Sequence, residues 1–113
     1  MLLILSIACL MLPGCAPKAE FDIRGEWAYT MTTTDGNTYD MGTITFSGEP
    51  ARGTYLELNI YQVEYKGEYT VDGAALELTG EETWQGVMTD ADTLNGTWSH
   101  DDGASGTFIA TRR

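Results

Sequence analysis

The feature that most constrains the fold is the alternation of large apolar and polar residues in the C-terminal part of the chain. Trp84, Met88, Leu94, Trp98 and Phe108 lie on one side of this alternation, and Asp- and Gly-containing turn sequences separate the runs. Successive side chains of a β-strand point to opposite faces of its sheet, whereas an α-helix needs an apolar residue every three or four positions. The pattern predicts an antiparallel meander of strands with one apolar face.

The same alternation continues upstream, with two ambiguous places. In the second predicted strand, residues 38–47, the apolar positions change from odd at Met41 to even at Ile44. A β-bulge at Gly42 is expected, because one extra residue flips every later side chain. In the third predicted strand the aliphatic residues are assigned to the interior: Leu56, Leu58 and Ile60. The alternate residues are then assigned to the outer face: Tyr55, Glu57, Asn59 and Tyr61.

About eight short strands with one apolar face each would leave unpaired edges unless the sheet closed on itself. The expected fold class is therefore all-β, a single small antiparallel up-and-down meander closing into a barrel over residues 23–113. No window in this region has helical periodicity.

The first thirteen residues form an almost unbroken apolar run. It is shorter than the ~20 residues that a membrane-spanning helix needs, so it indicates an export signal. The sequence Leu12-Pro13-Gly14-Cys15 that follows resembles the bacterial lipobox. The resemblance implies a signal peptide at 1–14, a lipidated Cys15 with a tether at 15–22, and attachment to the cell envelope. In a Gram-negative host, Ala16 after the lipidated cysteine would direct the lipoprotein to the outer membrane. An ordinary signal peptide or an N-terminal anchor is the alternative.

Cysteine content and charge exclude several classes of function. With Cys9 removed and Cys15 lipidated, the mature chain has no thiol for a disulfide, for catalysis or for a metal. The net charge of −11 disfavours binding to nucleic acids and to anionic membrane surfaces. No nucleotide, phosphate or Cys/His metal motif is present, so no cofactor is expected.

The sequence Gly25-Glu26-Trp27 and the late Arg112 resemble features of the calycins, the group of lipocalins, fatty-acid-binding proteins and avidins. In that group the Trp closes the floor of the barrel and an Arg packs over its ring. The resemblance implies a calycin-like barrel with the closing pair Trp27 and Arg112. The second lipocalin signature is missing, since Thr89-Asp90 is followed by Ala91.

Aromatic residues are the main candidates for a binding site. An eight-stranded barrel is just wide enough to be filled by side chains or to hold one small ligand. The rings expected to point inward or to line a mouth are Trp27, Tyr29, Tyr65, Tyr69, Trp84 and Trp98. Tyr55 and Tyr61 on the outer face form a second candidate surface.

The candidates for a metal-binding or catalytic site are weaker than those for an aromatic binding site. His100, Asp101 and Asp102 could contribute to a divalent cation site, although Asp-Asp-Gly is also ordinary turn chemistry. Acidic pairs such as Glu81-Glu82 are expected in turns, with nothing apolar beside them to raise a pKa. Catalysis is therefore not expected.

These observations favour a non-catalytic envelope lipoprotein whose barrel binds a small apolar or amphipathic ligand at one mouth. The alternative is a structural or protein-interaction module with a filled core. A carboxylate-dependent glycan hydrolase or a divalent-cation binder comes third.

Overall fold

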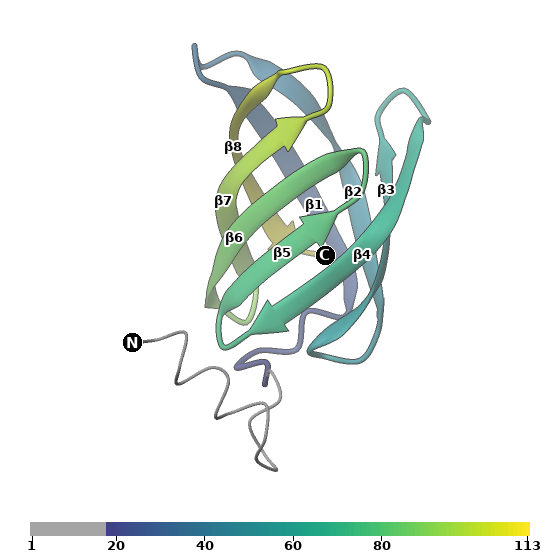
Figure 1. Ribbon diagram of the computed structural model, residues 1–113, viewed down its shortest axis with the longest axis vertical. Helices are drawn as coiled ribbons and strands as arrows, with labels where there is room; N and C mark the ends of the chain where they lie inside the picture. The colour runs from purple at the N-terminus through teal and green to yellow at the C-terminus, as the bar shows by residue number, and fades with distance from the viewer. Residues whose placement is uncertain (1–17) are drawn as a thin grey trace.

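The computed structural model describes residues 18–113, and all eight regular elements in this range are β-strands. They are β1 (Gly25–Thr33), β2 (Thr38–Gly48), β3 (Arg52–Asn59), β4 (Glu64–Asp72), β5 (Ala75–Thr79), β6 (Glu82–Asp90), β7 (Thr93–His100) and β8 (Ser105–Arg112). Each pairs antiparallel with the next and β8 pairs with β1, so the sheet is a closed barrel (Figure 1). The predicted all-β up-and-down barrel is confirmed.

The predicted signal peptide at 1–14 and the lipidated Cys15 lie outside the described residues. Within residues 18–113, no helix is long and apolar enough to pass through a bilayer.

The barrel has two distinct ends. The turns after β2, β4 and β6 gather at one end, which we call the floor, and the turns after β1, β3, β5 and β7 form the opposite end, the mouth (Figure 1). The chain before β1 runs beneath the floor. There the Gly73 amide donates to the Lys18 carbonyl and the Glu20 amide donates to the Gly73 carbonyl, both at 2.7 Å. The second half of the expected tether is thus hydrogen-bonded to the barrel.

The inward face of the sheet supplies the core. Trp84, Trp98 and Phe108 are buried, so the alternation predicted for the C-terminal strands is confirmed. The ring of Trp84 lies 5.4 Å from that of Tyr29 and 4.6 Å from that of Phe108, between centroids. Fully burying a large apolar side chain stabilises a fold by roughly 1.5–3 kcal/mol. These rings therefore contribute to stability together with the other large side chains of the core, among them Trp27, Phe46 and Leu78.

The register change in β2 comes from a bulge at Tyr39, and the prediction of a bulge at Gly42 was wrong. Thr32 of β1 faces Thr38 and Met31 faces Asp40, so Tyr39 is the extra residue. From Asp40 onward the even-numbered positions point inward, and Met41 is exposed. The alternation of residue types shows that the inward face changes within β2, but only the pairing with β1 shows which residue forms the bulge.

The prediction of which face of β3 points into the barrel was also wrong. The face assigned to the interior lies outside, and the face assigned to the outside lies inside. Tyr55, Glu57 and Asn59 are buried, whereas the predicted interior residues Leu56 and Ile60 are exposed. Leu58 is half-buried, and Val63 is exposed in the turn after β3.

The neighbouring strands explain the register of β3. Tyr55 faces Phe46 of β2 and Gly67 of β4. A Cβ atom at Gly67 would lie 2.7 Å from the Tyr55 ring, so the missing side chain of Gly67 makes room for that ring. Because β3 carries large side chains on both faces, its own sequence does not show which face is inside.

Candidate functional site

The floor of the barrel is sealed by Trp27 and Arg112. Trp27 is fully buried, and its Nε1 donates a 2.8 Å hydrogen bond to the Ile23 carbonyl. The Cζ atom of Arg112 lies 4.5 Å from the centroid of the Trp27 ring. The Arg112 guanidinium also donates to three backbone carbonyls, those of Asp22 (2.6 Å), Arg24 (2.8 Å) and Ala91 (2.9 Å). The structure thus brings together the two residues that the calycin resemblance pairs, and this end is closed.

The other aromatic residues predicted to point inward divide between the two halves of the barrel. Tyr69 belongs to the floor half, where its hydroxyl donates to the Glu49 carbonyl in the β2–β3 turn. Tyr29, Trp84 and Trp98 are buried in the core, and Tyr65 at the start of β4 is half-buried. Of these candidates, Tyr29, Tyr65, Trp84 and Trp98 surround a group of polar side chains beneath the mouth.

This polar group is the main functional feature that the sequence-based interpretation missed. Its buried members are Asp40, Glu57, Asn59 and Glu82. Glu57 has 0 % of its surface exposed and Glu82 has 2 %. Glu57 points inward from β3 and Glu82 points inward from β6, so the expectations that Glu57 would face outward and that Glu82 would stand in a turn were both wrong. We call Glu57 and Glu82 the buried acid pair.

The two carboxyl groups of the pair lie within hydrogen-bonding reach of each other. Glu57 Oε2 accepts a 2.8 Å hydrogen bond from the Tyr29 hydroxyl, and Glu82 Oε1 accepts one of 3.3 Å from Trp84 Nε1. Among the described residues, no donor reaches the buried Glu57 Oε1. This oxygen is unsatisfied when Glu57 is ionised, whereas a protonated Glu57 carries a donor of its own.

Burial raises the pKa of Glu57 to about 9, and the negative charge of Glu82 is the next cause. Burial also raises the pKa of Glu82, while the hydrogen bonds from Glu57 and Trp84 oppose that shift. No ion pair within residues 18–113 involves either carboxyl group. The pair therefore holds a proton at neutral pH, and no Lys or Arg side chain neutralises it.

Asp40 and Asn59 connect this region to the turn between β3 and β4. Asn59 Nδ2 donates to Asp40 Oδ2 at 3.3 Å. Asn59 Oδ1 accepts from the backbone amides of Tyr61 and Val63 at 2.9 and 3.0 Å. The turn is thus fixed from inside the barrel and forms one side of the mouth. Tyr61 is exposed as predicted, whereas Tyr55, the other half of the predicted outer surface, is not.

The rim of the mouth carries the predicted cation candidates. His100 faces Glu82 in the β6–β7 pairing, and its Nδ1 lies 3.4 Å from an oxygen of the exposed Asp102. Asp101 is exposed in the same turn. In the part of the chain that the structure describes, no three His, Cys, Asp or Glu side chains are arranged to hold a metal ion. Tyr39 covers the rim, with its ring centroid 4.4 Å from that of Trp98.

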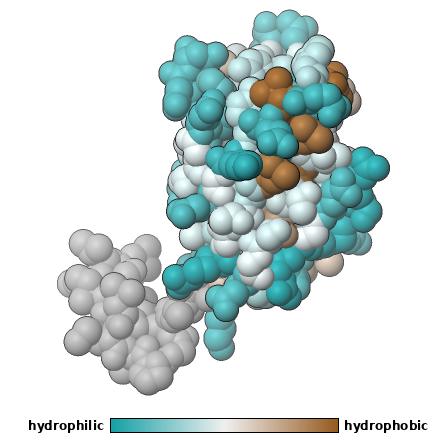
Figure 2. Space-filling model, turned by 90° about the vertical axis from the view of Figure 1, so that its right-hand side faces the viewer, coloured by the Kyte–Doolittle hydropathy of each residue, from teal (hydrophilic) through white to brown (hydrophobic). Residues whose placement is uncertain are grey.

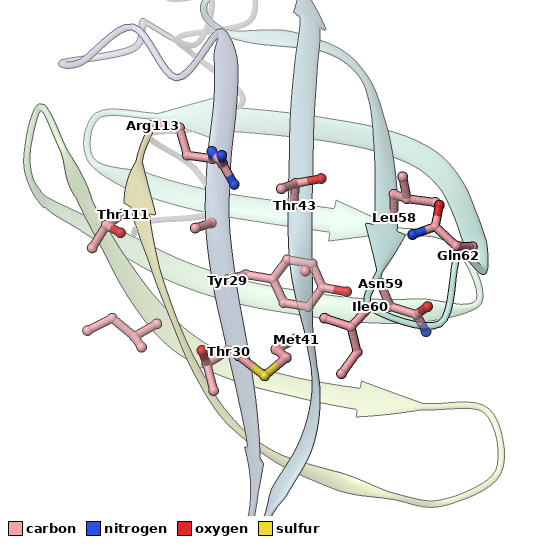
Figure 3. Close-up of a pocket in the computed structure, with 13 residues that line it drawn as sticks. Tyr29, Thr30, Met41, Thr43, Leu58, Asn59, Ile60, Gln62, Thr111 and Arg113 are labelled. Carbon is pink, nitrogen blue, oxygen red and sulfur yellow. The ribbon is translucent and has the colours of Figure 1, made fainter.

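A hollow lies on the outside of the barrel, over β8, β1, β2 and β3. This outer groove has a volume of about 510 Å³ and is lined by Met41, Leu58, Ile60 and Ile109 among others, with Arg113 toward one end (Figure 3). Apolar side chains also gather on the adjoining surface near the mouth (Figure 2). The groove is open to solvent, and the buried residues Tyr29 and Asn59 belong to its lining.

The sequence did contain one signal for the acid pair. Glu82 stands two residues before Trp84, so the alternation of β6, extended backward, places it on the inward face. No comparable signal marks Glu57, because its position depends on the pairing of β3 with its neighbours.

Comparisons with solved structures support the fold. A de novo designed fluorescence-activating β-barrel aligns with a TM-score of 0.59 and 17% identity, covering 81% of this chain and 94% of that chain. The redesigned β-barrel mFAP0, solved bound to DFHBI, aligns with a TM-score of 0.62 and 20% identity, covering 80% and 98%. At such identities the likeness concerns the fold alone. No protein-family model and no curated protein matches the sequence.

Proposed function

We propose that this protein is a non-catalytic lipoprotein of the cell envelope whose barrel binds a small apolar or amphipathic molecule through its mouth. The buried acid pair, set among aromatic rings, is the observation that carries the proposal. Two carboxyl groups without a cationic partner cost stability in a core, and closing a barrel does not require them. Buried titratable groups with shifted pKa values are typical of functional sites.

The fold suits this role. The designed barrels mFAP0 and mFAP1 were solved with DFHBI bound, and this chain covers 98% and 94% of them. A barrel of this architecture and size can therefore hold one small molecule. In the present protein the floor is sealed by Trp27 and Arg112, so a ligand would enter from the mouth.

The geometry of the pair supports binding rather than hydrolysis. Glycosidases hold their two carboxyl groups roughly 5–9.5 Å apart, so that a sugar and, in inverting enzymes, a water molecule fit between them. Glu57 and Glu82 are close enough to share a hydrogen bond. Carboxyl groups that share a hydrogen bond lie closer together than either glycosidase geometry requires.

The envelope location rests on the lipobox-like sequence ending at Cys15. Lys18, the first described residue, lies beneath the floor. A lipid on Cys15 would hold the floor toward the bilayer and leave the mouth facing away from it.

A protein-interaction module is the second candidate, and the outer groove favours it. Its exposed aliphatic residues Met41, Ile60 and Ile109 lie on one side of the barrel. Apolar surface of this kind often marks a contact site for another protein.

Native mass spectrometry of the protein purified from its own host tests the proposal. We expect a bound small molecule, which is lost in a Tyr65→Trp variant because the larger ring fills the mouth. An Ile109→Arg variant, altered in the outer groove, should keep the ligand. If only Ile109→Arg loses it, the groove is the binding site. If no ligand is found and a protein partner is lost on Ile109→Arg, the interaction module is correct.

A further inference from the structure

We infer that the ligand of the mouth is a protonated amine on an apolar body, and that its ammonium group binds between Glu57 and Glu82 in place of the proton they share. This inference rests on the proposed function and names the chemical class of its ligand.

The ionised pair leaves one oxygen of Glu57 unsatisfied. Tyr29 occupies Glu57 Oε2, and Trp84 occupies Glu82 Oε1, but no donor in residues 18–113 reaches Glu57 Oε1, although Glu57 is fully buried. An ammonium group brings N–H donors and a positive charge to this place. It would satisfy the free oxygen and supply the counter-charge that the described ion pairs do not provide.

Aromatic side chains lie beside the pair and at the rim of the mouth. Tyr65 stands directly opposite Glu57 in the β3–β4 pairing, and Tyr39 packs on Trp98 at the rim. Aromatic faces attract cations and also accommodate an apolar body. Tyr39 and Tyr65 are partly exposed, whereas the acid pair is buried. We expect these two rings to move aside when the ligand enters.

Other ligand classes fit less well. A metal ion would require several oxygen ligands converging on one point, and no such cluster exists within residues 18–113. An anion would meet two carboxyl groups in a chain whose net charge is −11. A neutral ligand would leave the pair without a counter-charge.

The exchange has a defined proton balance. The free pair carries one proton and one negative charge, and binding of the cation releases that proton to solvent. The titratable groups close to the pair are Tyr29 on β1, Tyr39 and Asp40 on β2, Tyr55 on β3, Tyr65 on β4 and His100 on β7. Binding should therefore strengthen as the pH rises from about 6 to about 8, with about one proton released.

Three probes with the same phenyl group test the inference: phenethylamine, 2-phenylethanol and 3-phenylpropionate. Each is titrated into the purified protein by calorimetry in buffers of different ionisation enthalpy, with Trp fluorescence as a second readout. Phenethylamine should bind at least about tenfold more tightly than 2-phenylethanol, and 3-phenylpropionate should not bind. Release of about one proton should accompany binding of the amine only.

Glu57→Gln and Glu82→Gln keep the shape of the site and should each weaken phenethylamine binding about tenfold or more. Glu81→Gln, exposed beside the pair, is the matched control and should bind like the wild type. Because amides remove the buried charge, both test variants should stay folded, which urea unfolding would verify.

The inference is overturned if the three probes bind equally, if amine binding releases no proton, or if Glu81→Gln weakens binding as much as Glu57→Gln. It also falls if phenethylamine does not bind at all. None of these outcomes decides the proposed function, which is tested separately by native mass spectrometry of the protein purified from its host.

Discussion

The hydroxyl of Tyr29 on β1 donates a 2.8 Å hydrogen bond to Oε2 of Glu57 on β3, reaching past β2 inside the barrel. It fixes one oxygen of the carboxyl group and leaves Oε1 without a donor in the described chain. Burial raises the pKa of both residues, and the charge of Glu57 raises that of Tyr29 further. The protonation of Glu57 therefore affects the stability of the whole barrel.

Stability should decrease as the pH rises. Because the pKa of Glu57 is raised from 4.5 to about 9 in the folded state, the folded chain binds more protons than the unfolded chain between these values. Stability falls with pH wherever the folded state binds more protons. We expect the unfolding free energy, measured with urea, to fall by ~2 kcal/mol or more between about pH 5 and about pH 8.

The Glu57→Gln variant is the control for this pH dependence. It cannot ionise at this position, so its stability should change much less over the same range. An equal slope in the variant and the wild type would show that Glu57 is not the group responsible.

The register of β3 can be tested with two alanine substitutions. Tyr55→Ala should cost ~3–5 kcal/mol of unfolding free energy, because it empties a buried site beside Phe46 and Gly67. Leu56→Ala, on the outer face, should cost less than ~1 kcal/mol. Thermal and urea unfolding of both variants would measure this. The opposite order would mean that the aliphatic face of β3 is the inner one.

The fork-shaped head group of Arg112 should be necessary for a stable floor. Arg112→Lys keeps the charge but cannot donate to three carbonyls while lying over Trp27. We expect a loss of ~1–3 kcal/mol in urea unfolding. Arg113→Lys, at the exposed neighbouring position, is the matched control and should change stability by less than ~0.5 kcal/mol. Equal effects would refute a specific role for Arg112.

Gly67 should not tolerate a side chain. A Cβ atom there would lie 2.2 Å from the Thr79 carbonyl oxygen and 2.7 Å from the Tyr55 ring, so Gly67→Ala should destabilise the barrel by ~3 kcal/mol or more. Gly73→Asn is the control, since Gly73 has open space around it and Asn tolerates its φ of 63°. Its cost should stay below ~1 kcal/mol in thermal unfolding. A mild effect of Gly67→Ala would show that the β4 backbone can shift.

If Cys15 carries a lipid anchor, a fatty-acid probe should label the protein at this residue. In a bacterial host supplied with a fatty-acid probe, the wild-type protein should become labelled and fractionate with membranes, whereas Cys15→Ala should do neither. The Cys9→Ala variant serves as the control and should be labelled normally. Labelling that survives Cys15→Ala would refute the proposed anchor.

Most of the architecture could be predicted from the sequence because one physical rule governs it. In β1 and β6 to β8 the aromatic residues all lie on one face, so inward positions such as Trp27, Trp84 and Trp98 follow directly from the alternation. The turns after β1, β4, β5, β6 and β7 contain Asp or Gly, which favours tight connections there. Closure then follows from the need to pair the sheet edges.

The candidate site could not be predicted in the same way. In β3, Tyr55 and Leu56 are both large, and hydrophobicity alone favours the aliphatic side chains for the core. The actual choice depends on the space that Gly67 leaves on another strand. That choice brings Glu57 inside, where a rule based on apolar residues would not place a carboxylate. The buried acid pair is thus a product of tertiary pairing.

The pairing of β1 with β8 also affects how the chain folds. All other strand pairs are neighbours in the sequence, so they form local hairpins of low contact order. The pairing of Trp27 with Arg112 spans nearly the whole domain and must wait for the final strand. A nascent chain that still lacks this strand is an open sheet with two unpaired edges, prone to aggregation until synthesis is complete.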